Sequence, residues 1–172
     1  SNVGVDETLI KNTVVHVVKY LDQKGRLYAP KKVLDIEEKG LDYLVSVGLM
    51  VVDGQRVGFV HQSILDYFIS SRMIKQFYDG ETIEQIVGEK NKQTPGKRYQ
   101  VQMFLQNLLE YDSSDFISAG MQLEKSTQIR YYVKYIFYEI LRQISEPDEE
   151  IIEYIIKTCA DKESADYLLK NV

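Results

Sequence analysis

Apolar side chains in the first part of the chain recur with the spacing of a helix. Between residues 6 and 23 they lie three and four positions apart, which predicts an amphipathic helix with Asp6 as its N-cap. Gly25 is expected to end this helix, because glycine adopts the left-handed conformation that follows many helices. Residues 25–30 then predict a short extended piece.

Two shorter helices are expected next, over residues 31–36 and 38–47, with Gly48 as the C-cap of the second. The pattern then changes to that of a hairpin. Residues 49–52 and 57–60 are rich in β-branched and aromatic side chains, and they flank an Asp-Gly pair. Such a pair between two strand-like runs is a strong short-range hairpin signal.

A further helix is predicted from Ser63, which we expect as its N-cap, to about Phe77. Residues 1–79 therefore have the order helix, short strand, helix, helix, hairpin, helix. Three helices closed by a two-stranded wing is the order of a winged-helix domain.

From residue 80 onward the pattern is helical only. Turn signals at Thr94-Pro95-Gly96, Asp112-Ser113 and Glu146-Pro147 separate the helices. The expected helices cover residues 82–90, 100–111, 114–122, 128–144, 148–159 and 162–170. Short turns between helices predict an antiparallel, repeat-like array over residues 80–172, with 128–144 as its buried central helix. The fold class is therefore mainly α, with a winged-helix-like domain before a helical array.

The two halves of the chain differ in net charge. The formal net charge is −5. Residues 1–79 hold 10 basic and 10 acidic side chains, whereas residues 80–172 hold 11 and 16, so the excess lies in the helical half. Proteins that bind nucleic acid usually show a basic stripe instead, and we therefore do not expect nucleic acid as a partner.

Cysteine and histidine usage excludes several kinds of site. Cys159 is the only cysteine, and His16 and His61 are the only histidines, so neither an internal disulfide nor a structural zinc site is expected. No signal peptide or membrane-spanning run is present, and we expect a cytoplasmic protein with no membrane partner. The chain begins with Ser-Asn, which is typical of what remains after a purification tag is removed. We therefore expect a piece of a longer protein.

Motifs for catalysis are missing. The sequence contains neither a phosphate-binding Gly-x-x-x-x-Gly-Lys-Ser/Thr nor a Gly-x-Ser-x-Gly. The acidic clusters Glu37/Glu38 and Glu149/Glu150/Glu153 fall at helix starts, where solvated acids suit the helix dipole. We expect no catalytic residue and no enzyme activity from this chain by itself.

The two histidines differ in context. His16 lies within Val-Val-His-Val-Val and is expected to be a satisfied, partly buried helix residue. His61 ends the second hairpin strand just before a helix, where backbone N–H groups favour anions. It could bind a phosphate there, or it could bond a backbone carbonyl. The residues alone favour the second reading.

Two features of the sequence bear on whether the chain binds nucleic acid. The predicted recognition segment over residues 37–46 offers Lys39 against three acids, Glu37, Glu38 and Asp42, so phosphates would be repelled. The aromatic run Tyr131, Tyr132, Tyr135, Phe137 and Tyr138 resembles a stacking platform for bases. Its helical spacing predicts core and inter-helix packing instead.

The segment from Gly58 to Ser71 resembles a motif of signal-transducing NTPases with a NACHT-type or related STAND ATPase core. Those proteins carry Phe-x-His-x-(Ser/Thr)-x-x-(Glu/Asp)-(Tyr/Phe)-x-x-Ala at the end of their winged-helix domain. The matching residues here are Phe59, His61, Ser63, Asp66, Tyr67 and Phe68, with Ser70 or Ser71 in place of the alanine.

The resemblance implies a regulatory role. In that family the winged helix folds back on the ATPase core of the same chain, and the histidine matching His61 contacts the phosphates of bound ADP. Exchange for ATP releases the module, the protein oligomerises, and the helical part senses a ligand or protein effector. Many prokaryotic members act in defence against phage. Ser63 would support His61, while ATP, ADP and Mg²⁺ would belong to the parent protein, because this chain lacks the ATPase core.

Two other classes remain open. One is a winged-helix DNA-binding transcriptional regulator with a helical dimerisation or ligand domain, which would need a basic recognition helix. The other is a small hydrolase that uses carboxylates, which would need a concave pocket with convergent acids.

Overall fold

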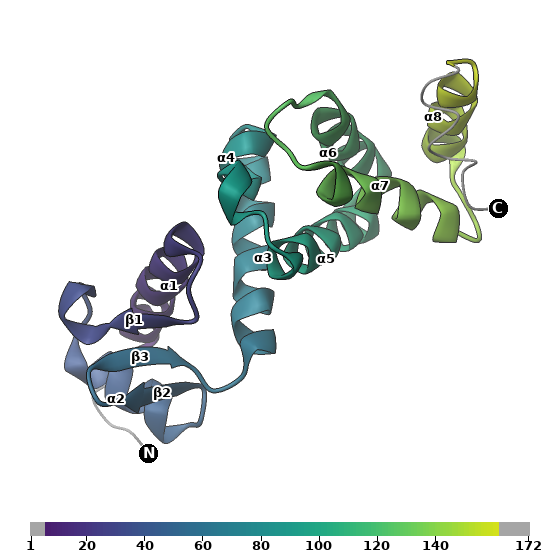
Figure 1. Ribbon diagram of the computed structural model, residues 1–172. Helices are drawn as coiled ribbons and strands as arrows, with labels where there is room; N and C mark the ends of the chain where they lie inside the picture. The colour runs from purple at the N-terminus through teal and green to yellow at the C-terminus, as the bar shows by residue number, and fades with distance from the viewer. Residues whose placement is uncertain (1–5, 162–172) are drawn as a thin grey trace. The chain divides into compact units, whose positions relative to one another are not determined.

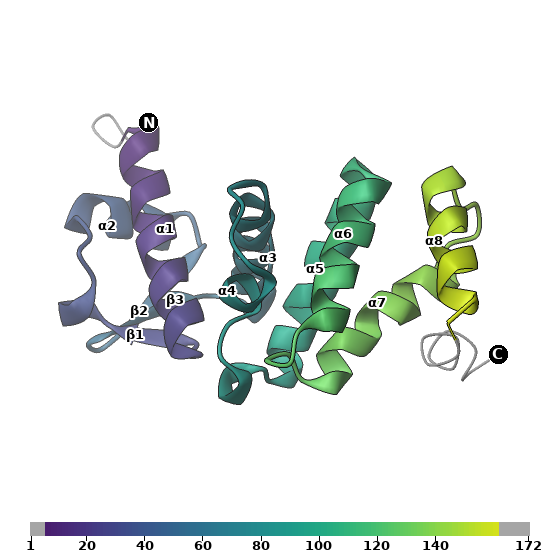
Figure 2. The same ribbon diagram turned by 90° about the horizontal axis from the view of Figure 1, so that it is seen from above.

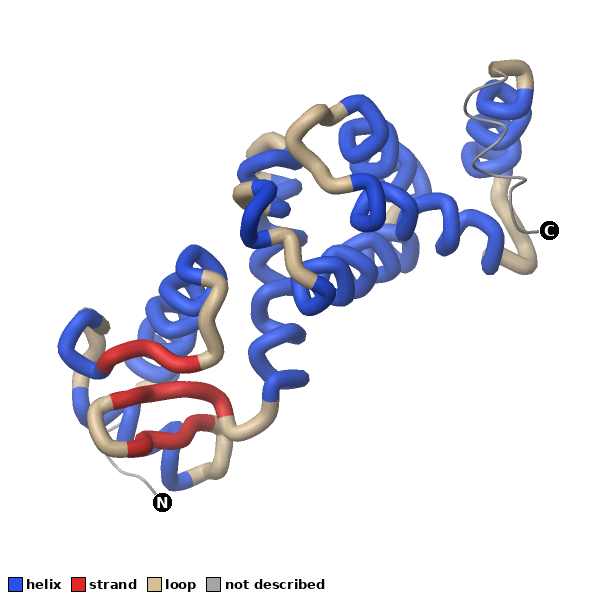
Figure 3. Tube along the Cα trace, viewed as in Figure 1, coloured by secondary structure: helices blue, strands red, loops and turns tan. Residues whose placement is uncertain are grey.

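The computed structural model describes residues 6–161, which form a mainly helical fold with one small sheet (Figure 1, Figure 3). The predicted fold class is confirmed. The chain divides into two compact units, the first ending at Ile69 and the second beginning at Ser70. This division falls inside helix α3 (Gln62–Tyr78), whereas the boundary expected from the sequence, after residue 79, falls at the end of that helix.

Helix α1 (Glu7–Lys24) has both of its predicted ends. The side chain of Asp6 accepts a 2.7 Å hydrogen bond from the backbone N–H of Leu9, and so satisfies one of the free donors of the first turn. Gly25 follows the helix with φ of 60° and ψ of 42°, a left-handed conformation that suits glycine.

The sheet contains the predicted hairpin and one further strand. Strands β1 (Tyr28–Pro30), β2 (Met50–Asp53) and β3 (Arg56–Phe59) pair antiparallel in the order β1-β3-β2. Asp53 pairs with Arg56, so the turn consists of Gly54 and Gln55, and Gly54 has a φ of 60°. Each hairpin strand is displaced by one residue from its predicted position.

The two short helices of this unit differ from expectation. The helix predicted over 31–36 is a single 3-10 turn, η1 (Lys31–Val33). Helix α2 (Glu38–Ser46) has Val47 as its C-cap, so the predicted C-cap, Gly48, lies one residue beyond the observed one, in a left-handed conformation. The element order still matches the predicted winged-helix-like domain. Its core consists of apolar residues from α1, α2 and the sheet: Val17, Leu21, Ala29, Leu41, Leu44, Met50 and Val57.

The C-terminal unit contains the end of α3 and the helical array (Figure 2). Its further elements are α4 (Ile83–Val87), η2 (Lys90–Lys92), α5 (Pro95–Tyr111), α6 (Ser113–Lys125), α7 (Tyr131–Gln143) and α8 (Glu149–Cys159). The helix expected over residues 162–170 lies outside the described residues.

Helix α5 begins five residues earlier than predicted. Thr94 caps it by accepting a hydrogen bond from the N–H of Lys97, and Pro95 is its first residue. Proline suits that position, because its missing N–H would have no partner in the first turn. The predicted helix breaker is therefore a helix start.

Helices α5, α6 and α7 pack together around buried aromatic rings. Phe104, Phe116 and Phe137 are fully buried, and the rings of Phe116 and Phe137 lie 5.1 Å apart. Gly120 of α6 lies directly against the ring of Phe137. Asp112 alone separates α5 from α6, and its side chain accepts a hydrogen bond from the N–H of Ser114 at 2.7 Å.

Helix α7 is amphipathic and not buried on all sides. Val133, Ile136 and Phe137 are fully buried, but Tyr131 is 56% exposed. The expectation of a buried central helix is therefore wrong for one face of α7. Among residues 6–161, no helix is both long enough and apolar enough to cross a membrane.

Candidate functional site

His61 lies at the junction between the wing and helix α3. Strand β3 ends at Phe59, and α3 begins at Gln62. Val60 still donates its N–H to the carbonyl of Leu49 at 3.1 Å, and the N–H of Ile64 bonds the carbonyl of His61 at 3.1 Å. The backbone on both sides of His61 is therefore held, while its side chain is exposed.

Aromatic residues of the same motif fix this corner. Phe59, at the end of β3, is only 6% exposed, and its ring centroid lies 5.6 Å from that of Phe68 on α3. Phe68 also meets Tyr67 edge-on at 5.5 Å. Since these contacts join the last residue of the strand to the second turn of the helix, they hold the intervening His61 at a defined point of the surface.

Ser63 lies in the first turn of α3 and not at its cap. The helix begins one residue before Ser63, so the predicted capping role is wrong, and His61 is the residue that directly precedes the helix. Ser63 is exposed, like His61. Within residues 6–161 neither side chain makes a hydrogen bond, so the alternative of a His61 ring bonded to a backbone carbonyl is not observed.

The chemistry open to this corner is anion binding. The first N–H groups of a helix have no partner within the helix, and they carry the positive end of the helix dipole. An imidazole and a hydroxyl beside them add two further donors. This arrangement suits a phosphate oxygen, and it offers no nucleophile–base pair for catalysis.

A small hollow lies beside the corner, lined by Leu27, Tyr28, Phe59, Val60, Gln62 and Leu65. Its volume is about 160 Å³, well below the roughly 300 Å³ at which ligand pockets begin. The guanidinium of Arg56 lies 5.6 Å above the ring of Tyr28 and adds positive charge nearby. The hollow is therefore too small to enclose a whole nucleotide.

His16 serves as a contrast to His61. Its Nδ1 lies 2.8 Å from the carbonyl oxygen of Asn12, one turn earlier in α1, so the ring has a partner as expected. The side chain is exposed, however, and the expectation of partial burial is wrong.

The surface of α2 does not suit DNA. Glu38, Lys39 and Asp42 are all exposed on this helix. Lys31 lies 2.9 Å from the carboxylate of Glu38, so part of the small positive charge near the helix is already paired. A helix in the major groove needs free basic or amide side chains, and this helix presents a net negative face.

A groove of about 770 Å³ lies between α6 and α8. Four acids line it, Glu124, Glu150, Glu153 and Asp161, and two of them, Glu124 and Glu150, are held by neighbouring hydroxyls. Tyr154 donates to Glu124 at 3.2 Å, and Ser114 donates to Glu150. These bonds join α6 to α8 and give Glu124 and Glu150 a structural role.

The acids at helix starts behave as the sequence predicts. Glu37, Glu38, Glu149 and Glu150 are exposed. At the start of α8, Asp148 accepts hydrogen bonds from the Ser113 hydroxyl and the Ile151 N–H, and these bonds lower the pKa of its carboxyl. No group of three or more metal-ligating side chains is present within residues 6–161.

The aromatic run of α7 is divided between core and surface. Phe137 and Tyr138 are buried, as predicted, but Tyr131 is largely exposed, and Tyr132 and Tyr135 are half-buried. Arg98 bonds the backbone of Tyr132, and Arg130, which directly precedes Tyr131, bonds the carbonyl of Lys90. The sequence pattern did not predict that these basic segments meet. The absence of any acid between residues 90 and 109 was the available signal.

Comparisons with known proteins identify no relative. No family model, no curated protein and no solved structure matches the chain. A functional proposal therefore depends on the geometry of the sites and on the resemblance of residues 58–71.

Proposed function

We propose that this chain is a non-catalytic regulatory and interaction fragment of a STAND/NACHT-like NTPase, which couples nucleotide state to partner sensing or oligomerisation. The observation that carries the proposal is the position of His61. Its side chain is exposed and makes no hydrogen bond with any described residue, at the start of a 17-residue helix, in a corner fixed by Phe59 and Phe68.

In this proposal His61 contacts the phosphates of ADP bound in the ATPase core of the same parent chain. Ser63 adds a hydroxyl donor from the first turn of α3, and not through capping. Because the hollow beside the corner is too small for a nucleotide, the core must hold the base and sugar. The helical unit contacts a protein effector or ligand. ATP and ADP are cofactors of the parent protein only, and prokaryotic defence is one setting that fits.

The test compares two exposed histidines in the parent protein. His61→Ala removes the proposed phosphate contact, whereas His16→Ala removes a ring that, among the described residues, bonds only its own helix. A hydrogen bond to a charged group contributes about 1.5–3 kcal/mol. We therefore expect His61→Ala to accelerate ADP release by roughly 10- to 100-fold and to raise basal oligomerisation. The release of a fluorescent ADP analogue and light scattering measure the two effects.

The proposal fails if His61→Ala and His16→Ala release ADP equally slowly. It also fails if the native protein has no phosphate-binding loop within about 300 residues upstream of Val3, roughly the span of two ordinary domains. A DNA-binding regulator would then be the best remaining class, and nanomolar, salt-dependent binding to a specific duplex would be required of it.

A further inference from the structure

Basic residues in the C-terminal unit are concentrated in two segments. Residues 90–100 and 128–143 together contain seven basic side chains and a single acid, Glu139. The basic residues are Lys90, Lys92, Lys97, Arg98, Arg130, Lys134 and Arg142. The rest of residues 80–172 holds 4 basic and 15 acidic side chains, since the totals are 11 and 16. Although this half has a net negative charge, its basic and acidic residues are therefore concentrated in different segments.

Hydrogen bonds bring the two basic segments together in space. The buried side chain of Gln93 donates to the carbonyl of Gln128 at 3.0 Å and accepts from the N–H of Arg130 at 2.7 Å. The Nε of Arg130 donates to the carbonyl of Lys90, also at 2.7 Å. These three bonds place the start of α7 against the 3-10 turn that precedes α5.

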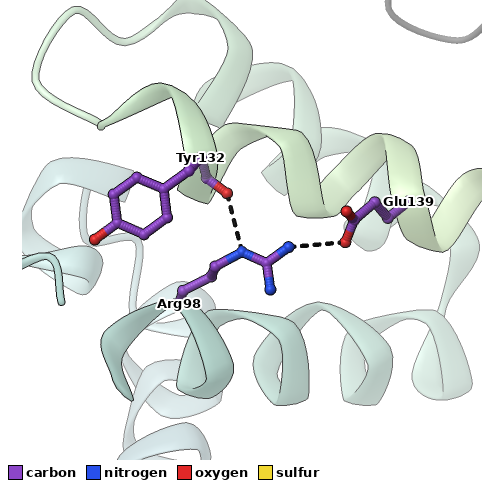
Figure 4. A network of polar contacts seen from close by, with 3 residues as sticks. All are labelled: Arg98, Tyr132 and Glu139. Atoms are coloured by element: carbon purple, nitrogen blue, oxygen red, sulfur yellow. Dashed lines mark hydrogen bonds and ion pairs between the residues drawn. The ribbon is translucent and has the colours of Figure 1, made fainter. Parts of the chain in front are cut away.

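A second set of bonds joins α5 to α7 (Figure 4). Arg98 of α5 donates from Nε to the carbonyl of Tyr132 at 3.3 Å and forms an ion pair with Glu139 at 2.9 Å. The one acid of the two segments is thus already occupied. No other acid within these two segments is therefore available to neutralise their remaining basic side chains.

Three of the basic side chains have no carboxylate partner within residues 6–161. Lys134 donates to a backbone carbonyl, that of Glu124, at 3.1 Å, and Arg130 likewise bonds only a carbonyl. Lys90 is exposed, and no ion pair is formed by its ammonium group. Bonds to carbonyls position these groups but do not neutralise them, so Lys90, Arg130 and Lys134 remain attractive to an anion.

Aromatic rings form a ladder on the same helix. The rings of Tyr131 and Tyr135 stack with centroids 6.2 Å apart and an interplanar angle of 28°. The guanidinium of Arg142 covers the ring of Tyr135 at 5.3 Å. Tyr131, at the end of the ladder, is 56% exposed. Because residues four apart lie one above the other on a helix, Arg130 and Lys134 form a row beside Tyr131 and Tyr135.

We propose that this basic–tyrosine surface, made of Lys90, Arg130, Tyr131, Lys134 and Tyr135, binds a short stretch of single-stranded nucleic acid. A base stacks on or beside the exposed ring of Tyr131, and the three cations neutralise neighbouring phosphates. Sequence-tolerant binding of single strands combines these two elements, stacking on aromatic rings and a basic track for the backbone. In a duplex the bases already stack on one another, so the tyrosines would contribute little.

Binding of a single strand departs from the expectation that nucleic acid is not a partner. That expectation used the net charge of the whole half, which averages this surface with the acidic groove between α6 and α8. It also used the helical spacing of the aromatic run, which predicts packing for all five rings although Tyr131 is exposed. The basic–tyrosine surface is also independent of the proposed role of His61, because it consists only of residues of the C-terminal unit.

The test measures binding of the 172-residue chain to fluorescein-labelled oligo-uridine and oligo-thymidine of about 12 nucleotides by fluorescence anisotropy at several salt concentrations. Tyr131→Ala should weaken binding by about 5- to 100-fold, the effect of losing one stacked base. Arg130→Gln with Lys134→Gln should weaken it too and lower the salt slope by about 1.4, for two phosphate contacts on a single strand. Tyr131→Phe keeps the ring and should retain the affinity.

The matched control changes the same charge elsewhere. Lys125→Gln with Lys157→Gln removes two cations from the groove between α6 and α8 and should leave the affinity unchanged. Circular dichroism checks that each variant is folded, and the retained affinity of Tyr131→Phe separates stacking from general destabilisation.

Several results would overturn the inference. They are the absence of saturable binding, an equal loss in the Lys125/Lys157 control, or tighter binding of a duplex of the same length. Equal competition by poly-glutamate together with an unaffected Tyr131→Ala variant would also overturn it, and would indicate an acidic protein as the partner.

Discussion

Gly120 allows helix α6 to lie against the ring of Phe137, and we expect Gly120→Ala to destabilise the C-terminal unit. An added Cβ would overlap three atoms of that ring. The ring cannot easily move, because Phe137 is fully buried and lies 5.1 Å from the ring of Phe116 and 5.6 Å from that of Tyr154. The structure therefore predicts the sign of the effect.

The magnitude follows from two opposing contributions. Alanine in a helix interior is favoured over glycine by about 1 kcal/mol. Overpacking of a close-packed core costs about 1–3 kcal/mol, and backbone shifts toward the upper end of that range are expected when a fixed ring is in the way. The net loss in the free energy of unfolding should be about 1–2 kcal/mol.

Urea unfolding followed by far-ultraviolet circular dichroism measures this change. Phe137→Leu makes room for the methyl group, so the double variant should lose less than the sum of the two single losses by at least about 1 kcal/mol. The transition that responds to Phe137→Leu identifies the C-terminal unit if the two units unfold separately. An increase of about 1 kcal/mol in the free energy of unfolding of Gly120→Ala would refute the reasoning, because the helix propensity of alanine alone would then determine the result.

Three further changes test other parts of the fold. Gly58→Ala should destabilise the N-terminal unit by about 1–3 kcal/mol in urea, because a Cβ would lie 2.6 Å from the ring of Tyr28; an unchanged midpoint would contradict this. Asp6→Ala should cost about 1 kcal/mol in the same assay, since the cap of α1 is lost, and Asp6→Asn should restore most of it. Burial, and after it the nearby Glu124 carboxylate, raises the pKa of the Tyr154 hydroxyl to about 12. The contribution of the neutral hydroxyl to the free energy of unfolding is therefore complete below pH 10 and is lost as the pH rises through 12. Tyr154→Phe should lose less stability over that interval, and equal losses in both proteins would show that Tyr154 is not responsible.

Local signals with a single physical meaning predicted the structure well. An aspartate before an amphipathic run, a glycine at its end and Asp-Gly between two β-rich runs each correspond to one backbone conformation, and α1 and the hairpin follow them. Pro95 was misinterpreted because proline both ends helices and begins them, and only the capping contact of Thr94 shows which applies.

The two candidate sites differ in how much of each could be predicted from the sequence. The sequence singles out His61 as a candidate because its neighbours form a contiguous motif, although it places the cap of α3 at Ser63, two residues after the residue that precedes the helix. The sequence does not predict the basic–tyrosine surface, because Lys90 lies 40 residues before Arg130 and the two segments are joined by Gln93. A side-chain bridge of this kind has no periodic signature, so the sum of charges along the chain concealed it.

The single residue between α5 and α6 has a consequence for how this protein can vary in length. Asp112 is both the C-cap of α5 and the N-cap of α6, so no further linker residue lies between the two helices. Inserting one residue there would turn α6 by about 100° about its own axis and move Gly120 away from Phe137. Homologues should therefore tolerate insertions in the loop between α6 and α7 far better than at Asp112, and the α5–α6 pair should be inherited as a unit of constant length.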